Sequence, residues 1–133
     1  MLVDSHCHLD YPGLAEDEAG VVARARTAGV TVLQTIGTKL STFEHVLAIA
    51  ERHEGVWCSV GVHPHEAGRE GLDDPAPLLR WTQHPKVIGV GESGLDYFYD
   101  HSPRDRQAAS FRTHIAAARA SGLPLIVHTR DAD

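Results

Sequence analysis

The sequence is poor in cysteine and aromatic residues, and it lacks both long apolar runs and an excess of positive charge. Only two of its 133 residues are cysteines, so a disulfide framework is excluded and a reducing cytoplasm is expected. No apolar run approaches the ~18 residues of a membrane span, and no basic segment leads into an apolar one. We therefore expect neither a membrane anchor nor a secretory signal. The net charge of −6 disfavours a basic nucleic-acid-binding module.

Apolar residues and histidines, by contrast, are plentiful. The chain is 42% hydrophobic and 23% charged, which excludes a disordered protein and fits one globular domain over residues 1–133. It also contains ten histidines. Because histidine is the commonest metal ligand and titrates near neutral pH, the positions of these residues guide the functional interpretation.

Strands and helices are predicted to alternate along the chain. Apolar, β-branched runs bounded by turns predict five strands, at residues 1–8, 30–36, 56–62, 87–91 and 125–128. Helical spacing of apolar residues predicts four helices, within residues 21–28, 41–50, 74–81 and 102–121. Strands separated by helices pair in parallel through right-handed crossovers, and such strands usually have both faces covered.

Two α/β architectures fit this order, an open doubly wound sheet and part of a (β/α)₈ barrel. A complete barrel needs ~250 residues, so the chain would supply about five strands and four helices of one. This is a partial TIM barrel that ends after the fifth strand. Ser41 and Glu44 are expected to form a capping box at the start of the second helix. The fourth helix is expected to bury a stripe of Ala108, Phe111, Ile115 and Ala118.

Chemically active side chains follow four of the predicted strands at their carboxyl ends. The four segments are Asp4-Ser5-His6-Cys7-His8, Gly61-Val62-His63-Pro64-His65, Gly91-Glu92-Ser93-Gly94-Leu95-Asp96-Tyr97 and Val127-His128-Thr129-Arg130-Asp131. The carboxyl ends of parallel strands meet at one edge of the sheet, where α/β proteins place their ligand sites. We therefore expect these segments to converge.

Metal ligands are predicted among these residues. His6 and His8 lie two residues apart and so point to the same face of a strand, where two imidazoles can chelate one ion. The cysteine between them points away. Glu92 has no basic neighbour in the sequence and needs either a cation or a salt bridge to Arg130, and its two oxygens suit a bridging, catalytic role. His128 ends an apolar strand in the same way as His6.

Other polar residues at this edge are expected to contact substrate or to form structural hydrogen bonds. His63 and His65 are predicted to be loop residues at the rim, because Pro64 breaks the strand between them. Asp96 lies in a predicted turn, where it is suited to position neighbouring His or Arg side chains. Five other histidines are interpreted as surface residues on helices or helix ends, away from the strand edge: His45, His53, His84, His101 and His114.

The four segments together resemble the TatD family of metal-dependent deoxyribonucleases, within the wider group of amidohydrolase-like hydrolases. The resemblance covers nearly the whole chain and matches the N-terminal half of the family. It implies a (β/α)₈ barrel with two divalent ions, such as Mg²⁺, Mn²⁺ or Zn²⁺. His6 and His8 would hold one ion, Glu92 would bridge, and His128 would hold the second. The family pattern also has a later His and a later Asp, beyond residue 133.

The implied activity is hydrolysis of DNA phosphodiester bonds, at single-stranded ends, with His63, His65, Asp96 and Arg130 in contact with the substrate. Two divalent ions supply an activated nucleophile, stabilise the leaving oxygen and reverse the local negative charge. No basic groove with interleaved aromatic residues is visible, so sequence-specific reading of DNA is not expected. Two alternatives stay open. One is hydrolysis of an amide or ester bond at the same site. The other is a non-catalytic half-barrel that needs a partner, since this chain alone lacks the later ligands.

Overall fold

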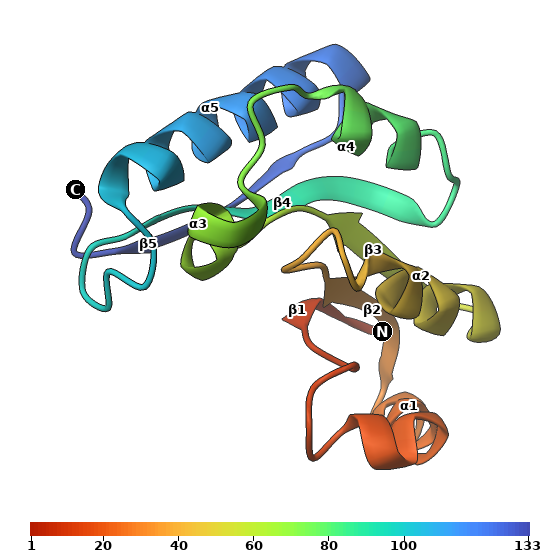
Figure 1. Ribbon diagram of the computed structural model, residues 1–133. Helices are drawn as coiled ribbons and strands as arrows, with labels where there is room; N and C mark the ends of the chain where they lie inside the picture. The colour runs from red at the N-terminus through yellow and green to blue at the C-terminus, as the bar shows by residue number, and fades with distance from the viewer.

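The computed structural model describes residues 1–133, in which five parallel strands alternate with helices (Figure 1). The strands are β1 (Leu2–Cys7), β2 (Val30–Ile36), β3 (Val56–Val60), β4 (Val87–Asp96) and β5 (Leu125–Arg130). The α-helices are α1 (Glu18–Thr27), α2 (Phe43–Arg52), α3 (Ala67–Glu70), α4 (Ala76–Trp81) and α5 (Arg104–Ser121). The 3₁₀ turns η1 (Ala15–Asp17) and η2 (Pro64–Glu66) precede α1 and α3. None of the helices combines the length and the hydrophobicity needed to cross a bilayer.

The strands pair in the order in which they occur in the sequence. The sheet runs β1-β2-β3-β4-β5, and every pair is parallel. A doubly wound sheet reverses its strand order at a switch point, so the sequential order identifies part of a (β/α) barrel. The predicted partial TIM barrel is confirmed. The helices lie along one face of the curved sheet (Figure 1).

The hydrophobic core lies between the sheet and its covering helices. It includes Phe43 of α2, Leu78 of α4 and Ala117 of α5, which pack against the same buried cluster as Val60 and Val90 of the sheet. Burying a large apolar side chain contributes ~1.5–3 kcal/mol. These contacts therefore hold the helices against the strands and give the sheet a rigid backing.

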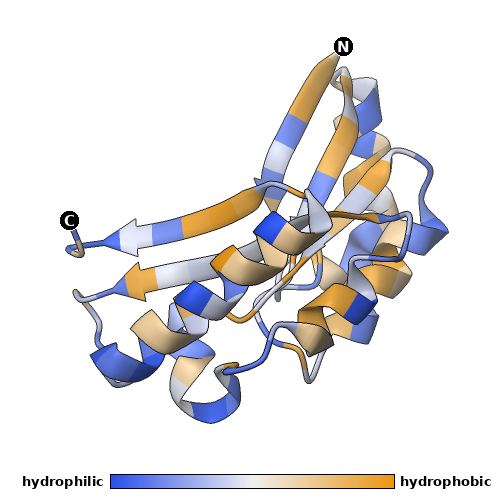
Figure 2. Ribbon diagram, turned by 90° about the horizontal axis from the view of Figure 1, so that it is seen from above, coloured by the Kyte–Doolittle hydropathy of each residue, from blue (hydrophilic) through white to orange (hydrophobic).

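The two edge strands are more exposed than the sequence predicts. Leu2 and Val3 of β1 are 60% and 59% exposed, and Val127 of β5 is 50% exposed. Each edge strand pairs on one side only, and the helices cover only one face of the sheet (Figure 1). The expectation that both faces of every strand are covered is therefore wrong for β1 and β5. Along β5, hydrophobic residues give way to hydrophilic ones towards its end (Figure 2).

Three local predictions about the helices are corrected. α2 begins at Phe43 without a side-chain cap, and the N–H of Ser41 donates to Glu70 instead of forming a capping box. α3 is a short helix that no sequence pattern predicts. The buried residues of α5 are Gln107, Ser110, Thr113, His114, Ala117 and Ala118. Of the predicted apolar stripe only Ala118 is among them, because the buried face of α5 also carries polar side chains that bond neighbouring segments.

His114 is fully buried, so its interpretation as a surface residue is wrong. Its Nε2 accepts a hydrogen bond from the N–H of Val62 at 2.9 Å, and its Nδ1 donates to the carbonyl oxygen of Ser110 at 2.7 Å. Burial lowers the pKa of His114, although the Ser110 carbonyl opposes this effect. The neutral ring therefore ties α5 to the segment that follows β3.

Two glycines bring the end of β3 close to the middle of β4. A Cβ atom on Gly61 would lie 2.5 Å from the Cα atom of Gly91. A Cβ atom on Gly91, where φ is +136°, would lie 2.5 Å from the carbonyl oxygen of Ile126 on β5. Only residues without a side chain fit this close approach. This close packing fixes the backbone of Gly91, directly before Glu92, between the end of β3 and β5.

We expect Gly61→Ala to destabilise the fold, because the new methyl group meets backbone atoms that cannot move aside. Overpacking of this kind costs ~1–3 kcal/mol, measured as a lower midpoint of urea denaturation. Gly20→Ala is the matched control. Gly20 lies in α1, its nearest contact is the exposed Asp17 side chain, and alanine favours a helix by ~1 kcal/mol. Equal stability of Gly61→Ala and the wild type would contradict the packing argument.

Candidate metal centre

Glu92 lies at the centre of the candidate site, on β4 and 8% exposed. Its Oε2 is 3.4 Å from Nε2 of His6 and 4.0 Å from Nε2 of His8, and its Oε1 is 3.2 Å from Nδ1 of His128. A buried carboxylate needs a cation or hydrogen-bond donors to compensate its charge. Imidazoles from both edges of the sheet surround the carboxylate of Glu92. The alternative partner, Arg130, forms no ion pair with it.

The backbone of β4 presents Glu92 and Asp96 to this rim. The N–H of Glu92 donates to the carbonyl oxygen of Gly37 at 2.9 Å. The pairing of β4 with β5 is irregular around Glu92 and then resumes with Ser93 opposite Val127 and Gly94 opposite His128. β4 continues to Asp96, so this residue ends a strand and does not lie in the predicted turn. Both carboxylates therefore sit on a paired strand, not on a flexible loop.

Asp96 anchors a second group of imidazoles. Its Oδ2 accepts hydrogen bonds from Nε2 of His65 and of His128, each at 2.9 Å, and its Oδ1 accepts from the N–H groups of Phe98 and Tyr99 at 3.2 and 2.9 Å. Burial alone would raise the pKa of Asp96, but these donors hold that pKa below its usual range. The carboxylate is 0% exposed. Its hydrogen bonds therefore restrain the rings of His65 and His128.

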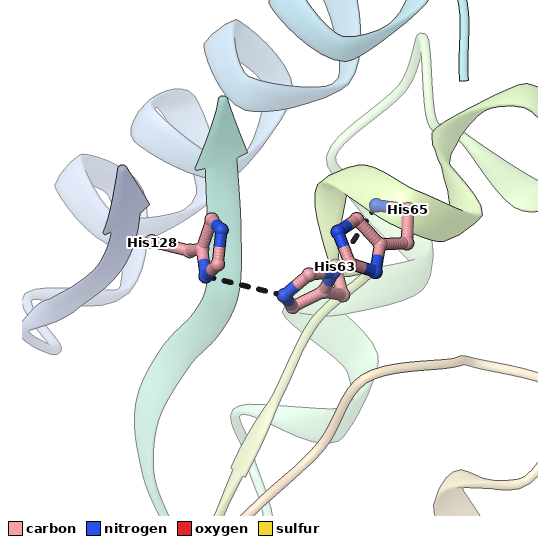
Figure 3. A group of neighbouring side chains, drawn as sticks. All are labelled: His63, His65 and His128. Carbon is pink, nitrogen blue, oxygen red and sulfur yellow. Dashed lines mark hydrogen bonds between the residues drawn. The ribbon is translucent and has the colours of Figure 1, made fainter. Parts of the chain in front are cut away.

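The hydrogen bonds assign the ring protons of these histidines. Because ionised Asp96 only accepts, Nε2 of His128 carries a proton and donates to it, while Nδ1 of His128 lies 3.2 Å from Oε1 of Glu92. Nδ1 of His63 accepts the N–H of His65 at 3.1 Å, so Nε2 of His63 donates towards Nδ1 of His128 at 3.3 Å (Figure 3). Burial, reinforced by the neighbouring imidazoles, lowers the pKa of His63 to about 3. Its ring is therefore neutral at pH 7.

Two groups of side chains are arranged so that each could share a metal ion. One group is His6, His8 and Glu92, and the other is His63, His65 and His128. Within each group the ligand atoms lie within 4.8 Å of one another. Neutral imidazole nitrogens and carboxylate oxygens suit Zn²⁺, Mn²⁺ and Fe²⁺, and burial lowers the pKa of His8, which favours the neutral, ligating form. The donor set therefore fits divalent metal ions.

A polar cavity of about 460 Å³ adjoins His63 and His65. It is lined by Asp10, Tyr11, Thr38, Lys39, Thr42, His63, His65 and Glu66. The ring of Tyr11 stacks on that of His8, with centroids 4.3 Å apart, and Nζ of Lys39 lies 3.8 Å from Glu66. The volume of the cavity is within the range of small-molecule sites, ~300–1,000 Å³. No motif in the sequence marks Tyr11 or Lys39, because each stands alone in a loop.

Further residues near the site differ in their involvement. His101 is exposed as predicted, but its ring centroid lies 4.6 Å from that of His65, so it is not distant from the strand edge. Cys7 bonds to a β2 carbonyl and packs against the core, as its position between two histidines predicts. Burial raises the pKa of Cys7 to about 12, and it does the same for Cys58. Both thiols are therefore protonated at pH 7 and belong to neither ligand group.

The sequence matches the family described as TatD related DNase over residues 3–133. The chain belongs to this family. The family resemblance inferred from the strand-end motifs is thus confirmed. This chain is 37% identical over 131 residues to the 3'-5' ssDNA/RNA exonuclease TatD of Enterobacter lignolyticus (strain SCF1). The match covers 98% of this chain and 50% of that protein. The chain is 35% identical over 132 residues to the uncharacterized metal-dependent hydrolase YabD of Bacillus subtilis (strain 168), covering 99% and 52%.

A solved structure of the TatD family has the same fold. The crystal structure of YJJV, a TatD homologue from Escherichia coli K12, matches with a TM-score of 0.88 at 32% sequence identity. The match covers 98% of this chain and 51% of that chain. The chain therefore spans about half the length of the TatD relatives it matches.

Acidification is expected to destabilise the metal-free protein through His63. Its pKa is about 3 in the fold against an ordinary 6.5, so folding favours the neutral ring. That contribution is complete above pH 6.5 and is lost as the pH falls from there towards 3. Between about pH 7 and about pH 4.5, we expect the wild type to lose ~1–2 kcal/mol more stability than His63→Gln.

The measurement is urea denaturation in the presence of EDTA at both pH values. His45→Gln is the control, because His45 is exposed on α2, and it should keep the pH dependence of the wild type. If His63→Gln lost as much stability as the wild type, the assignment of a neutral His63 would be wrong.

Proposed function

We propose that this chain supplies metal ligands of a nuclease that hydrolyses phosphodiester bonds at the ends of single-stranded DNA, through two divalent ions. One observation carries the proposal: the two oxygens of Glu92 face different histidines. Oε2 faces His6 and His8, whereas Oε1 faces His128. A carboxylate placed in this way is suited to bridge two ions, and paired ions are a common device for cleaving phosphodiesters.

In the proposed site, His6, His8 and Glu92 would hold one ion, and His128 with Glu92 would hold the second. Bound ions would activate a water molecule and neutralise the charge that develops on the phosphodiester oxygens. Asp96 accepts the Nε2 proton of His128, so Nδ1 is the nitrogen of this ring that would bind an ion. A carboxylate behind a ligating imidazole commonly fixes its ring orientation and raises its basicity. The donor set suits Mn²⁺ or Zn²⁺, and Mg²⁺ through Glu92 and water.

The cavity beside the histidines is proposed to receive the scissile phosphodiester. Lys39 supplies a cation there, and Glu66 restrains it. His63 is neutral, so it offers hydrogen bonding without adding charge to the site. With a net charge of −6, the chain repels nucleic acid at long range. Local cations, both protein side chains and bound metal, must therefore provide the attraction.

The direction of cleavage is proposed from a relative. The Enterobacter lignolyticus protein, which this chain matches over half of its length, is named a 3'-5' ssDNA/RNA exonuclease. We infer the same polarity for the protein that carries this chain. End-directed cleavage needs contacts to phosphate and metal only, and so it needs no side chains that read base edges.

Glu92→Gln is expected to lower metal-dependent cleavage of a labelled single strand by at least about 100-fold, because the amide nitrogen cannot ligate an ion. Mn²⁺ affinity should fall by roughly 10–100-fold in calorimetric titration. Glu51→Gln is the matched control: Glu51 also pairs with a histidine, His84, but on the exposed surface. Wild-type metal affinity and cleavage in Glu92→Gln would rule out the bridging role.

A further inference from the structure

The loop after β4 exposes a run of aromatic side chains next to the candidate metal centre. Tyr97, Phe98 and Tyr99 are consecutive, and Phe98 and Tyr99 are 59% and 48% exposed. The ring of Tyr99 stacks on His101, with an interplanar angle of 8° and centroids 5.4 Å apart. Exposed apolar side chains that cluster, instead of being scattered singly, mark an interaction site.

Cations accompany these rings. The guanidinium of Arg130 lies 5.3 Å from the ring centroid of Tyr99 and 5.9 Å from that of Phe98. Arg104 lies 4.2 Å from the ring of Tyr97, but it is also paired with Asp100. Arg130 forms no ion pair. The patch therefore combines two exposed aromatic side chains with a positive charge that no carboxylate neutralises.

The patch is rigidly connected to the site through Asp96. One oxygen of this carboxylate accepts the N–H groups of Phe98 and Tyr99, and the other accepts from His65 and His128. The ring of Tyr99 also lies 5.6 Å from that of His65, which lines the cavity. The aromatic faces are therefore held at a set position beside the place where a phosphodiester would be cleaved.

We propose that Phe98, Tyr99 and Arg130 form a stacking platform for the bases of a single-stranded nucleic acid, just outside the cavity. The proposal rests on the proposed nuclease function and names how the strand is held. Aromatic rings stack unpaired bases of any sequence, and arginine adds cation–π and phosphate contacts. Paired bases in a duplex do not offer their faces, so the platform selects single strands.

The charge of Arg130 favours a nucleic acid over an apolar protein surface as the occupant. An apolar partner would bury this guanidinium without a counter-charge, which is costly. A nucleic acid brings phosphates for the cation and bases for the rings. The sequence alone does not place Arg130 beside the aromatic loop. The pairing of β4 with β5 brings them together, because Arg130 lies opposite Asp96 in that pairing.

The test measures binding of a fluorescein-labelled oligothymidylate of about twelve residues, by fluorescence anisotropy in EDTA. We expect Phe98→Ala and Tyr99→Ala each to raise Kd roughly ten-fold. Phe98→Leu should weaken binding similarly, because leucine is apolar but has no π face, whereas Phe98→Trp should keep or improve it. Arg130→Gln should also reduce the salt dependence of Kd by about one ionic contact.

The control is Leu2→Ala, because Leu2 is equally exposed but lies at the opposite end of its strand from the rim. It should bind the strand with wild-type Kd. Wild-type Kd in both Phe98→Ala and Phe98→Leu would overturn the platform. The platform would also be overturned if the Phe98 variants lost binding only in proportion to a fall in thermal stability and Phe98→Trp did not restore binding.

A separate measurement distinguishes this proposal from the nuclease function. Calorimetric titration of Mn²⁺ into the wild type and into Glu92→Gln tests the metal centre without a strand to stack. Equal Mn²⁺ affinity of these two proteins, together with weaker strand binding in Phe98→Ala, would refute the two-metal site of the nuclease and retain the platform. Weaker Mn²⁺ binding in Glu92→Gln, together with unchanged strand binding in the Phe98 variants, would retain the metal site and refute the platform.

Discussion

Parallel pairing of consecutive strands is the constraint on which the candidate site depends. Each helical crossover returns the chain to the same end of the sheet, so every strand delivers its carboxyl end to one rim. His6 at the start of the chain and His128 near its end can therefore flank the same carboxylate of Glu92. The closely packed Gly61 and Gly91 hold the end of β3 against β4 beside Glu92.

The two carboxylates of β4 have different tasks because their surroundings differ. Glu92 and Asp96 lie four residues apart and so share a face of the strand, with Gly94 between them contributing no side chain. The oxygens of Asp96 are occupied by two imidazoles and two backbone N–H groups, and the residue is fully buried. Glu92 faces imidazoles whose nitrogens can equally bind an ion. One carboxylate therefore restrains imidazoles, while the other has oxygens that could bind an ion.

Local patterns in the sequence were sufficient for the strands and for the residues that meet at the rim. Alternation put His6 and His8 on one face, and the apolar run before His128 marked a strand end. Long-range contacts were not readable. Asp96 lies two residues after Gly94 and precedes an aromatic run, which favours a turn, but pairing with β5 extends the strand through it. His114 is buried because the distant N–H of Val62 needs an acceptor, and no helical periodicity records that need.

The buried thiols have a consequence for the kinds of ion that the rim can hold. Cys7 stands between the two histidines of β1 but faces the core, and its pKa of about 12 keeps the sulfur protonated. A thiolate is the ligand by which proteins retain soft ions. Copper(I) or cadmium arriving at this edge would find only nitrogen and oxygen donors. The side chain of Cys7 therefore adds no sulfur donor to this edge, and an oxidant finds no thiolate there at neutral pH.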